Sequence, residues 1–236
     1  MATQMYQWTG RCGPLDLEVS ESTFQPSTIS LLLADALEVH PGDEVIDIGC
    51  GSGVLAIVAA KLGAGRVIGV DSAPDVVAVA SRNAERHGVA DVVTFLQGDL
   101  LDPVGAEVKA DVIIGDVSGI PDAIAEESGW FPSRAGGGPR GSELPIRMLR
   151  AARQRLRAGG RLLLPTGTLQ DENAILRTAR ALYGRVTQLA ERRIPLPKAL
   201  AETTAMVRLA AEKTVQLTEK GSRLLWTARV WECTAP

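Results

Sequence analysis

Three short motifs in this 236-residue chain combine acidic residues with glycines in a pattern that can hold a small ligand. The first is a glycine-rich turn with Gly49, Gly51 and Gly53 at alternate positions, and Asp47 stands two residues before it. Such glycines let the backbone turn tightly and approach a ligand, because no Cβ intervenes. The turn alone also fits an ordinary strand-to-helix connection. Its spacing differs from the Gly-x-Gly-x-x-Gly of dinucleotide-binding enzymes.

The other two motifs each place an acidic residue after a predicted strand. Asp71, followed by Ser72, could accept hydrogen bonds from both hydroxyls of a ribose, because one carboxylate has about four lone-pair sites. Either residue could instead cap the next helix. Asp99 and Leu100 suit an adenine ring, the acid accepting from its amine and the leucine covering its face. The alternative for this pair is a surface turn.

These motifs lie on predicted strands that alternate with predicted helices. Apolar runs that end in glycine or an acidic residue indicate strands, and longer segments stopped by glycine indicate helices. Predicted strands occupy residues 45–48, 66–71, 92–96, 111–115, 161–164, 186–190 and 224–231, and predicted helices occupy residues 27–37, 54–62, 74–87, 144–156 and 171–182. This alternation predicts parallel βαβ units. Ligands of such sheets bind at the carboxyl ends of the strands.

The three motifs, in this order and on these elements, resemble those of class I S-adenosylmethionine-dependent methyltransferases over residues 43–164. The resemblance implies a Rossmann-like α/β fold. Its seven-stranded sheet is mostly parallel, with helices on both faces and an antiparallel last strand. S-adenosylmethionine is the implied cofactor. Asp47 and Gly49 are then expected near its methionine part, Asp71 at the ribose and Asp99 at the adenine.

A closer resemblance is to the HemK-like branch, which methylates glutamine and amino groups of proteins. Residues 23–26 and the following leucine-rich segment resemble an N-terminal segment of that branch, so we assign Phe24 and Pro26 to the cofactor site. Thr28 and Ile29 stand where that branch usually has acidic residues. Residues 137–141 and 156–163 resemble a later segment of the branch.

The main departure from that branch follows the fourth predicted strand. The branch has Asn/Asp-Pro-Pro-Tyr there, whereas this chain has Asp116-Val117-Ser118-Gly119. Asp116 keeps an acceptor that could orient an N–H or O–H, or act as a general base if burial raises its pKa. Ser118 is a second catalytic candidate. The alternatives are a carboxylate that caps the loop and an ordinary loop hydroxyl. Gly119 lacks the ring that would pack on a planar amide or base, which disfavours those substrates.

Candidate substrate-binding residues come from two regions. Trp130 and Phe131, in a long glycine-rich loop, could replace the missing ring or fold onto their own loop. Arg140 could meet a carboxylate or phosphate of the substrate, or belong to a solvated hinge. Tyr6 and Trp8 could cover the site from the N-terminal side, or pack on the sheet edge.

Composition excludes several other classes. The net charge is −3, which argues against a sequence-independent grip on nucleic acid. Three cysteines and two histidines form neither a disulfide framework nor a metal pattern, so we expect no metal. The longest apolar run, residues 54–60, is far shorter than the ~18 residues that span a bilayer. With no signal peptide visible at the N-terminus, we expect a cytoplasmic protein that does not bind membranes.

We therefore predict an S-adenosylmethionine-dependent methyltransferase. Residues 1–42 would form an N-terminal segment and lid, and residues 43–236 the methyltransferase domain, in one compact unit. The altered site, the lack of an added recognition domain and the acidic charge favour a small metabolite as acceptor, methylated on nitrogen or oxygen beside Asp116. The alternative acceptor is a protein side chain, either glutamine or an amino group. A non-catalytic S-adenosylmethionine-binding module is the alternative of another class, and nucleic acid is disfavoured as a partner.

Overall fold

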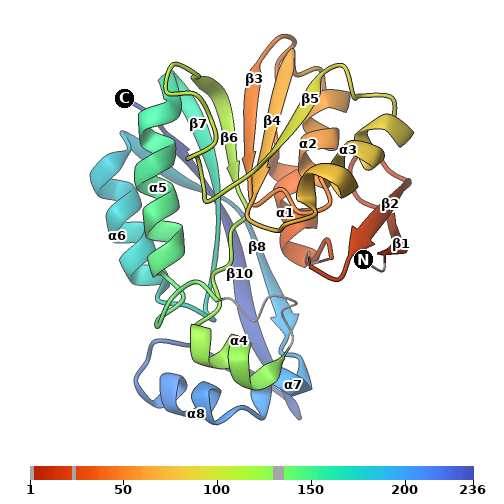
Figure 1. The fold of residues 1–236 in the computed structure, drawn as a ribbon. Coiled ribbons are helices and arrows are strands. Elements are labelled where there is room, and N and C mark those ends of the chain that lie inside the picture. Colours follow the sequence, from red (N-terminus) through yellow and green to blue (C-terminus); the bar gives the residue numbers. More distant parts are fainter. Residues whose placement is uncertain (1–2, 23–24, 130–135) are drawn as a thin grey trace.

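The computed structural model describes residues 3–22, 25–129 and 136–236 (Figure 1). Its centre is an eight-stranded sheet with the order β5-β4-β3-β6-β7-β10-β8, in which β9 pairs with β10. The parallel strands are β3 (Glu44–Ile48), β4 (Arg66–Asp71), β5 (Val93–Gln97), β6 (Ala110–Gly115) and β7 (Leu156–Gly167). β10 (Arg223–Thr234) runs antiparallel to β7, β8 (Arg185–Pro195) and β9 (Thr218–Lys220). The predicted sheet with an antiparallel last strand is confirmed, and β9 adds one short strand.

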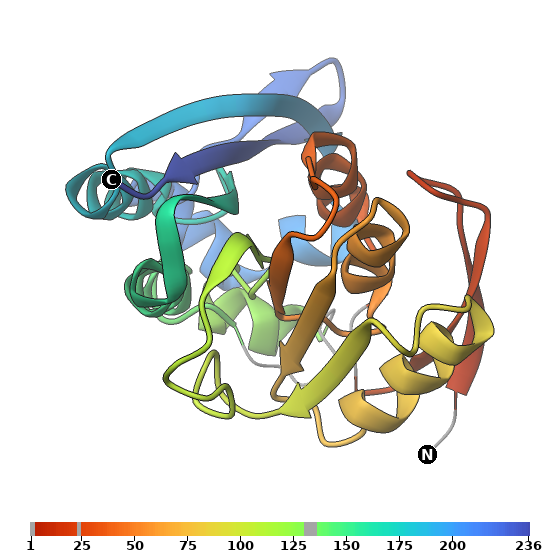
Figure 2. The same cartoon turned by 90° about the horizontal axis from the view of Figure 1, so that it is seen from above.

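Helices cover both faces of the sheet, and each face has its own apolar core. Figure 2 shows the two helical layers on opposite sides of a twisted sheet. One layer consists of α1 (Thr28–Ala36), α2 (Val54–Lys61) and α3 (Val76–Arg86), and the other of α5 (Glu143–Arg155) and α6 (Glu172–Leu182). Successive strand residues point to opposite faces. Val45 accordingly belongs to the first core and Ile46 to the second.

The N-terminal region forms a β-hairpin that was not predicted. β1 (Thr3–Trp8) pairs with β2 (Leu15–Ser20), which packs against α3. Asn83 of α3 fastens β2, because its side-chain amide accepts from the Glu18 amide N at 2.7 Å and donates to the Glu18 carbonyl at 2.8 Å. Trp8 is fully buried in the first core.

A small helical unit lies at the carboxyl ends of the strands, at the bottom of Figure 1. It consists of α4 (Asp122–Ser128), α7 (Lys198–Ala201) and α8 (Thr204–Ala211), which we call the three-helix cap. Its core contains Ile124, Leu200, Met206 and Leu209. α7 and α8 were not predicted, and α4 lies at the start of the long glycine-rich loop.

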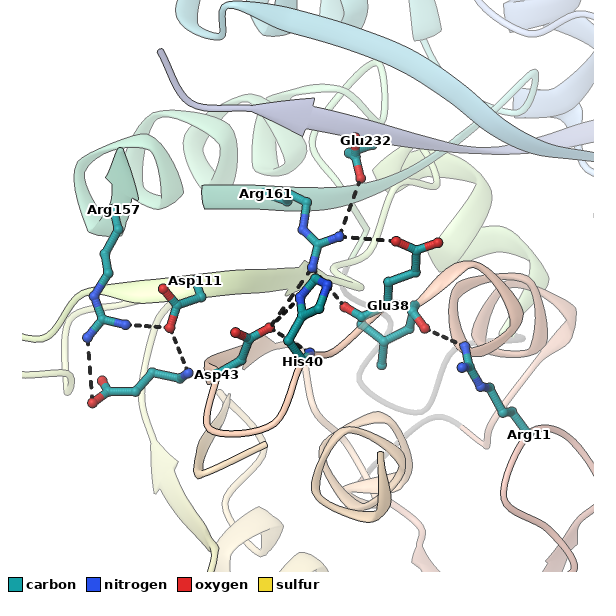
Figure 3. A network of polar contacts seen from close by, with 10 residues as sticks. Arg11, Glu38, His40, Asp43, Asp111, Arg157, Arg161 and Glu232 are labelled. Atoms are coloured by element: carbon teal, nitrogen blue, oxygen red, sulfur yellow. Dashed lines mark hydrogen bonds and ion pairs between the residues drawn. The ribbon is translucent and has the colours of Figure 1, made fainter. Parts of the chain in front are cut away.

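At the other end of the parallel strands, charged residues connect several segments of the chain (Figure 3). Arg161 of β7 donates to the Glu38 carbonyl at 3.1 Å and lies 4.0 Å from carboxylate oxygens of both Asp43 and Glu232. It thereby links the loop before β3 to β10. Among the described residues, no helix has the length and apolar character needed to cross a membrane.

Candidate functional site

A cavity of about 1210 Å³ opens at the carboxyl ends of the parallel strands. Residues that follow β3, β4, β5, β6 and β7 line it, together with the start of α1. A typical small-ligand pocket measures roughly 300–1,000 Å³. The cavity therefore has room for a cofactor and part of a second molecule.

The glycine-rich turn forms one wall of this cavity. Gly49 has φ +82°, and a Cβ there would collide with the backbone carbonyl of Asp116. The amide groups of Gly49 and Cys50 both donate to the Val70 carbonyl, at 2.8 and 3.1 Å. The turn is therefore held in place by contacts with β4 on one side and with the segment after β6 on the other. Gly49 and Gly51 line the cavity, whereas Gly53 begins α2 and packs near Phe95.

Asp71 is held in position by two backbone amides. Its Oδ2 accepts from the Gly51 amide and its Oδ1 from the Ala73 amide, both at 2.9 Å. Each carboxylate oxygen has lone-pair capacity beyond that single bond. Asp71 and Ser72 both line the cavity, so a ligand with two adjacent hydroxyls can bind this carboxylate.

Asp99 and Leu100 line the same side of the cavity. The Asp99 side chain is 51% exposed, and its Oδ2 accepts from Arg147 of α5 at 2.5 Å. A ring amine would share the carboxylate with this arginine. Pro26 also lines the cavity, whereas Phe24 lies outside the described residues.

Asp47 lies beneath the turn, fully buried and away from the cavity lining. Neither of its carboxyl oxygens has a hydrogen-bond partner among the described residues. Burial raises the pKa of Asp47 well above its usual range, and the nearby charges of Asp116 and Asp71 raise it further. Burial thus favours the protonated form of Asp47, which lies below the turn and outside the cavity lining. The predicted contact with the methionine part of a cofactor stays a prediction.

Asp116 lies on the cavity wall, next to Gly49 of the glycine-rich turn. Its amide donates to the Ile48 carbonyl at 2.9 Å, and its Oδ2 accepts from the Ser30 hydroxyl at 3.2 Å. Burial raises the pKa of Asp116 to about 6, and the charge of Asp71 adds to this effect, while the Ser30 hydrogen bond opposes it. At neutral pH this side chain is mainly a carboxylate that can accept a proton.

Sequence reasoning missed Ser30, although a signal for its helix position exists. Ser27 caps α1 by accepting from the Ile29 amide at 3.1 Å, and the Ser30 hydroxyl accepts from the Ser27 amide at 3.2 Å. A serine three residues after a serine cap is a variant of the capping box. The hydroxyl of Ser30 thus joins the start of α1 to Asp116.

The candidate substrate residues separate into three groups. Tyr6 lines the cavity, as does Ser118, the second catalytic candidate. Trp8 does not, and its indole N–H donates to the Arg11 carbonyl at 3.0 Å within the core, so we no longer assign it to the substrate. Arg140 is exposed, pairs with Asp171 at 2.9 Å and lies outside the cavity lining, so the same applies to it. Trp130 and Phe131 lie outside the described residues.

Two further cavity residues, Gln170 after β7 and Trp226 in β10, were not predicted. They come from segments far apart in the sequence. No local motif marks either of them.

The chemistry of the lining fits S-adenosylmethionine. The backbone of Gly49 and Gly51 lines the cavity, and Asp71 offers acceptors for ribose hydroxyls. Leu100 offers an apolar contact for adenine. Residues 23–120 match the family model described as ribosomal protein L11 methyltransferase (PrmA).

Comparison with known proteins supports this assignment. The chain is 49% identical over 98 residues to the ribosomal protein L11 methyltransferase of Pelotomaculum thermopropionicum, which covers 42% of this chain and 30% of that protein. It is 35% identical over 173 residues to the release factor glutamine methyltransferase of Geobacter sulfurreducens, which covers 70% of this chain and 60% of that protein. The chain thus spans less than two thirds of the length of either relative.

A solved structure shows the same fold. The T. thermophilus 16S rRNA N2 G1207 methyltransferase RsmC, in complex with AdoMet and guanosine, superposes with a TM-score of 0.64. The match covers 100% of this chain and 50% of that one at 16% identity. At such low identity the likeness concerns the fold alone.

The comparisons correct one prediction. A small molecule is wrong as the most favoured methyl acceptor, because the names of both relatives specify protein substrates. The prediction relied on the missing aromatic residue at Gly119 and on the acidic charge, and neither feature determines the size of an acceptor.

The sheet order, the order of the motifs and these similarities lead to one conclusion. The chain has the fold and the motif order of class I S-adenosylmethionine-dependent methyltransferases, and it is similar in sequence to a release factor glutamine methyltransferase, a HemK-like protein.

Proposed function

We propose that the protein transfers a methyl group from S-adenosylmethionine to a side-chain amide or amino nitrogen of a protein. The observation that carries this proposal is the position of Asp116, an acceptor on the cavity wall directly beside the glycine-rich turn. The 35% identity to a release factor glutamine methyltransferase over 70% of the chain supports a protein acceptor.

The cavity dimensions support the same acceptor. Beyond Asp116 the lining continues to Leu169, Ile194, Pro197 and Trp226, which present an apolar wall. Such a wall suits the aliphatic stem of a side chain whose polar end reaches Asp116. A side chain of this kind enters from one end while the cofactor occupies the other.

The proposed mechanism assigns a role to each side of the cavity. When bound, S-adenosylmethionine supplies an electrophilic methyl group on a sulfonium. Asp71 binds and orients the ribose. The Asp116 carboxylate accepts a hydrogen bond from the acceptor N–H, which directs the nitrogen lone pair towards the methyl group. With a pKa of about 6, Asp116 can also take the proton that the nitrogen loses.

A label-transfer experiment tests this function. The protein is incubated with methyl-labelled S-adenosylmethionine and an extract of the native host, and the products are treated with protease or nuclease and separated by size. We expect protease-sensitive label with the wild type and none with Asp116→Ala, while Asp91→Ala, an exposed residue outside the cavity lining, labels normally. Label confined to small molecules or to nuclease-sensitive material would contradict the proposal. Cofactor binding without any label would favour a non-catalytic module.

A further inference from the structure

We propose that the side-chain amide of Gln170 is a second polar group that positions the acceptor nitrogen opposite Asp116 and selects for it. This inference rests on the proposed function, because it concerns the same acceptor. Gln170 follows β7, and its side chain lines the main cavity together with Ser118 and Gly119. Although it lines a cavity, Gln170 is only 8% exposed.

The Gln170 carboxamide lies against Gly119. A Cβ at this position would collide with Oε1 of Gln170 and lie 3.0 Å from its Cδ. The carboxamide thus packs directly on the Gly119 backbone. Gly119 stands where the HemK-like branch has an aromatic residue. In this chain, glycine at that position leaves space that a planar amide fills.

The Gln170 carboxamide also has hydrogen-bonding capacity that a ligand can use. Among the described residues, no partner hydrogen-bonds to the Gln170 carboxamide. Gln170 lines the cavity, and its amide atoms are not among the buried polar atoms that lack a partner, so a bound group can reach them and hydrogen-bond to them. The Gln170 Oε1 can accept a hydrogen bond from one N–H of the nitrogen to be methylated, while Asp116 accepts from another N–H of the same nitrogen. The Gln170 Nε2 can donate to a neighbouring carbonyl. Two acceptors on one nitrogen fix the direction of its lone pair.

Hydrogen bonds and an ion pair hold the loop that carries Gln170. The Asp171 amide donates to the Arg140 carbonyl at 3.0 Å, and the Arg140 side chain pairs with the Asp171 carboxylate at 2.9 Å. Asp171 also caps α6 by accepting from the Ala174 amide at 3.1 Å. The Glu172 amide donates to the Gln170 carbonyl at 2.7 Å. A loop fixed in this way presents Gln170 in one place, and Arg140 acts on the loop rather than on a substrate.

The experiment measures the rate of label transfer to the protease-sensitive fraction of host extract, titrated to saturation. Gln170→Leu keeps a similar volume and removes both hydrogen-bonding atoms. We expect its saturating rate to fall about 10- to 100-fold, as for one lost buried hydrogen bond, with cofactor affinity by calorimetry unchanged. Gln188→Ala, an exposed glutamine of β8, is the control and transfers at the wild-type rate.

Two more variants separate positioning from structural support. Gly119→Ala alone should lower the rate of transfer, because its Cβ displaces the Gln170 carboxamide. When it is combined with Gln170→Ala it should lower the rate little further, because the effects of contacting residues are not additive. Gln170→Glu keeps an acceptor but adds a negative charge to the wall of the cavity that Asp116 also lines, which should move the acidic limb of the rate profile to higher pH. A purely structural residue would leave that limb in place.

The outcomes distinguish this inference from the proposed function. If the wild type labels protein and Gln170→Leu labels it equally fast, the inference is wrong and the proposed function stands. If Gln170→Leu loses cofactor affinity as well, Gln170 supports the fold and the inference is again wrong. If the wild type labels no protein, the proposed function fails and this inference fails with it.

Discussion

At the scale of single residues, three carboxyl groups near the same turn have different surroundings and therefore different uses. Asp47 is fully buried, has no hydrogen-bond partner among the residues that the structure describes, and has a pKa that burial raises. Asp71 accepts from two backbone amides. Asp116 accepts from one hydroxyl and has a pKa near 6. Because their surroundings differ, carboxyl groups of the same type can serve different purposes in one site, such as ligand binding and proton transfer.

Asp71 yields the first prediction. Asp71→Asn keeps one oxygen but loses the charge and one acceptor, so we expect the affinity for S-adenosylmethionine to fall about 10- to 100-fold. Isothermal titration calorimetry measures this change. Asp91→Ala, on an exposed turn, is the control and should bind as the wild type does. An unchanged affinity for Asp71→Asn would remove Asp71 from the cofactor site.

Asp116 predicts a pH dependence. Because its pKa is raised to about 6, the carboxylate is protonated as the pH falls through that value, and an acceptor of hydrogen bonds is lost. We expect kcat/KM for protein labelling to decrease below about pH 6. Asp116→Asn should lower the rate about 10²-fold or more and flatten this limb.

Ser30 provides the matched test of this limb. Its hydrogen bond stabilises the charged form of Asp116, so Ser30→Ala should raise the pKa and move the limb to higher pH. Rates measured between pH 5 and 9 at saturating cofactor give both curves. A limb that remains in Asp116→Asn would belong to another group.

The sequence was most informative at residues inside local motifs. The acidic residues at strand ends and Gly49 could be placed on the cavity wall, because the ends of parallel strands meet at one edge. Ser30 and Gln170 could not, since each reaches the cavity through packing between distant segments. The burial of Trp8 depends on a hairpin that no local pattern announces. The assigned roles of the cavity residues stay predictions.

At the scale of elements, the turn between β3 and α2 depends on a backbone that only glycine adopts without strain. Gly49→Ala would place a Cβ at φ +82° against the Asp116 carbonyl. Gly42 has φ +89° with nothing within 4 Å, so Gly42→Ala isolates the cost of the backbone conformation alone, about 1–2 kcal/mol. We expect Gly49→Ala to be less stable than Gly42→Ala and, unlike it, to lose cofactor binding.

Thermal unfolding and calorimetry of the two glycine variants provide the comparison. Equal stability and equal cofactor affinity would show that the close approach of the turn to Asp116 has no consequence. Gly42 is suited to the comparison because it lies before β3, at the edge of the sheet opposite the cavity.

Elements with strong periodicity were predictable and short ones were not. The strand at residues 66–71 has the predicted bounds, because an apolar run there ends at an acidic residue. β7 and β8 are longer than predicted, since β10 provides partners for polar residues such as Arg185 and Arg193. α7 has only four residues, too few for a helical period to be visible.

At the scale of the whole molecule, the two ends of the parallel strands differ in the contacts that stabilise them. The amino ends carry the ionic contacts of Arg161 with Glu38, Asp43 and Glu232. The carboxyl ends carry the cavity and the three-helix cap. Because ionic contacts fix the amino ends, the carboxyl ends can carry loops of varied sequence, as in other parallel α/β proteins.

The three-helix cap shares residues with the cavity. Leu169 and Trp226 contact the apolar core of the cap and also line the cavity. Asp71 and Gly51, on the cofactor side, line the cavity but have no part in that core. A substitution that destabilises the cap should therefore slow methyl transfer to the acceptor and leave the affinity for the cofactor unchanged.

Met206→Ala tests this separation. Met206 is 2% exposed in the core of the cap, and truncating a buried methionine costs about 2–5 kcal/mol. We expect faster hydrogen exchange in residues 198–211 and slower transfer to the acceptor, with cofactor affinity unchanged. The adjacent Val207 is 67% exposed on the same helix, so Val207→Ala should change stability by less than about 0.5 kcal/mol and leave exchange and transfer as in the wild type. Loss of cofactor affinity in Met206→Ala would mean that the cap and the cofactor side form one cooperative unit.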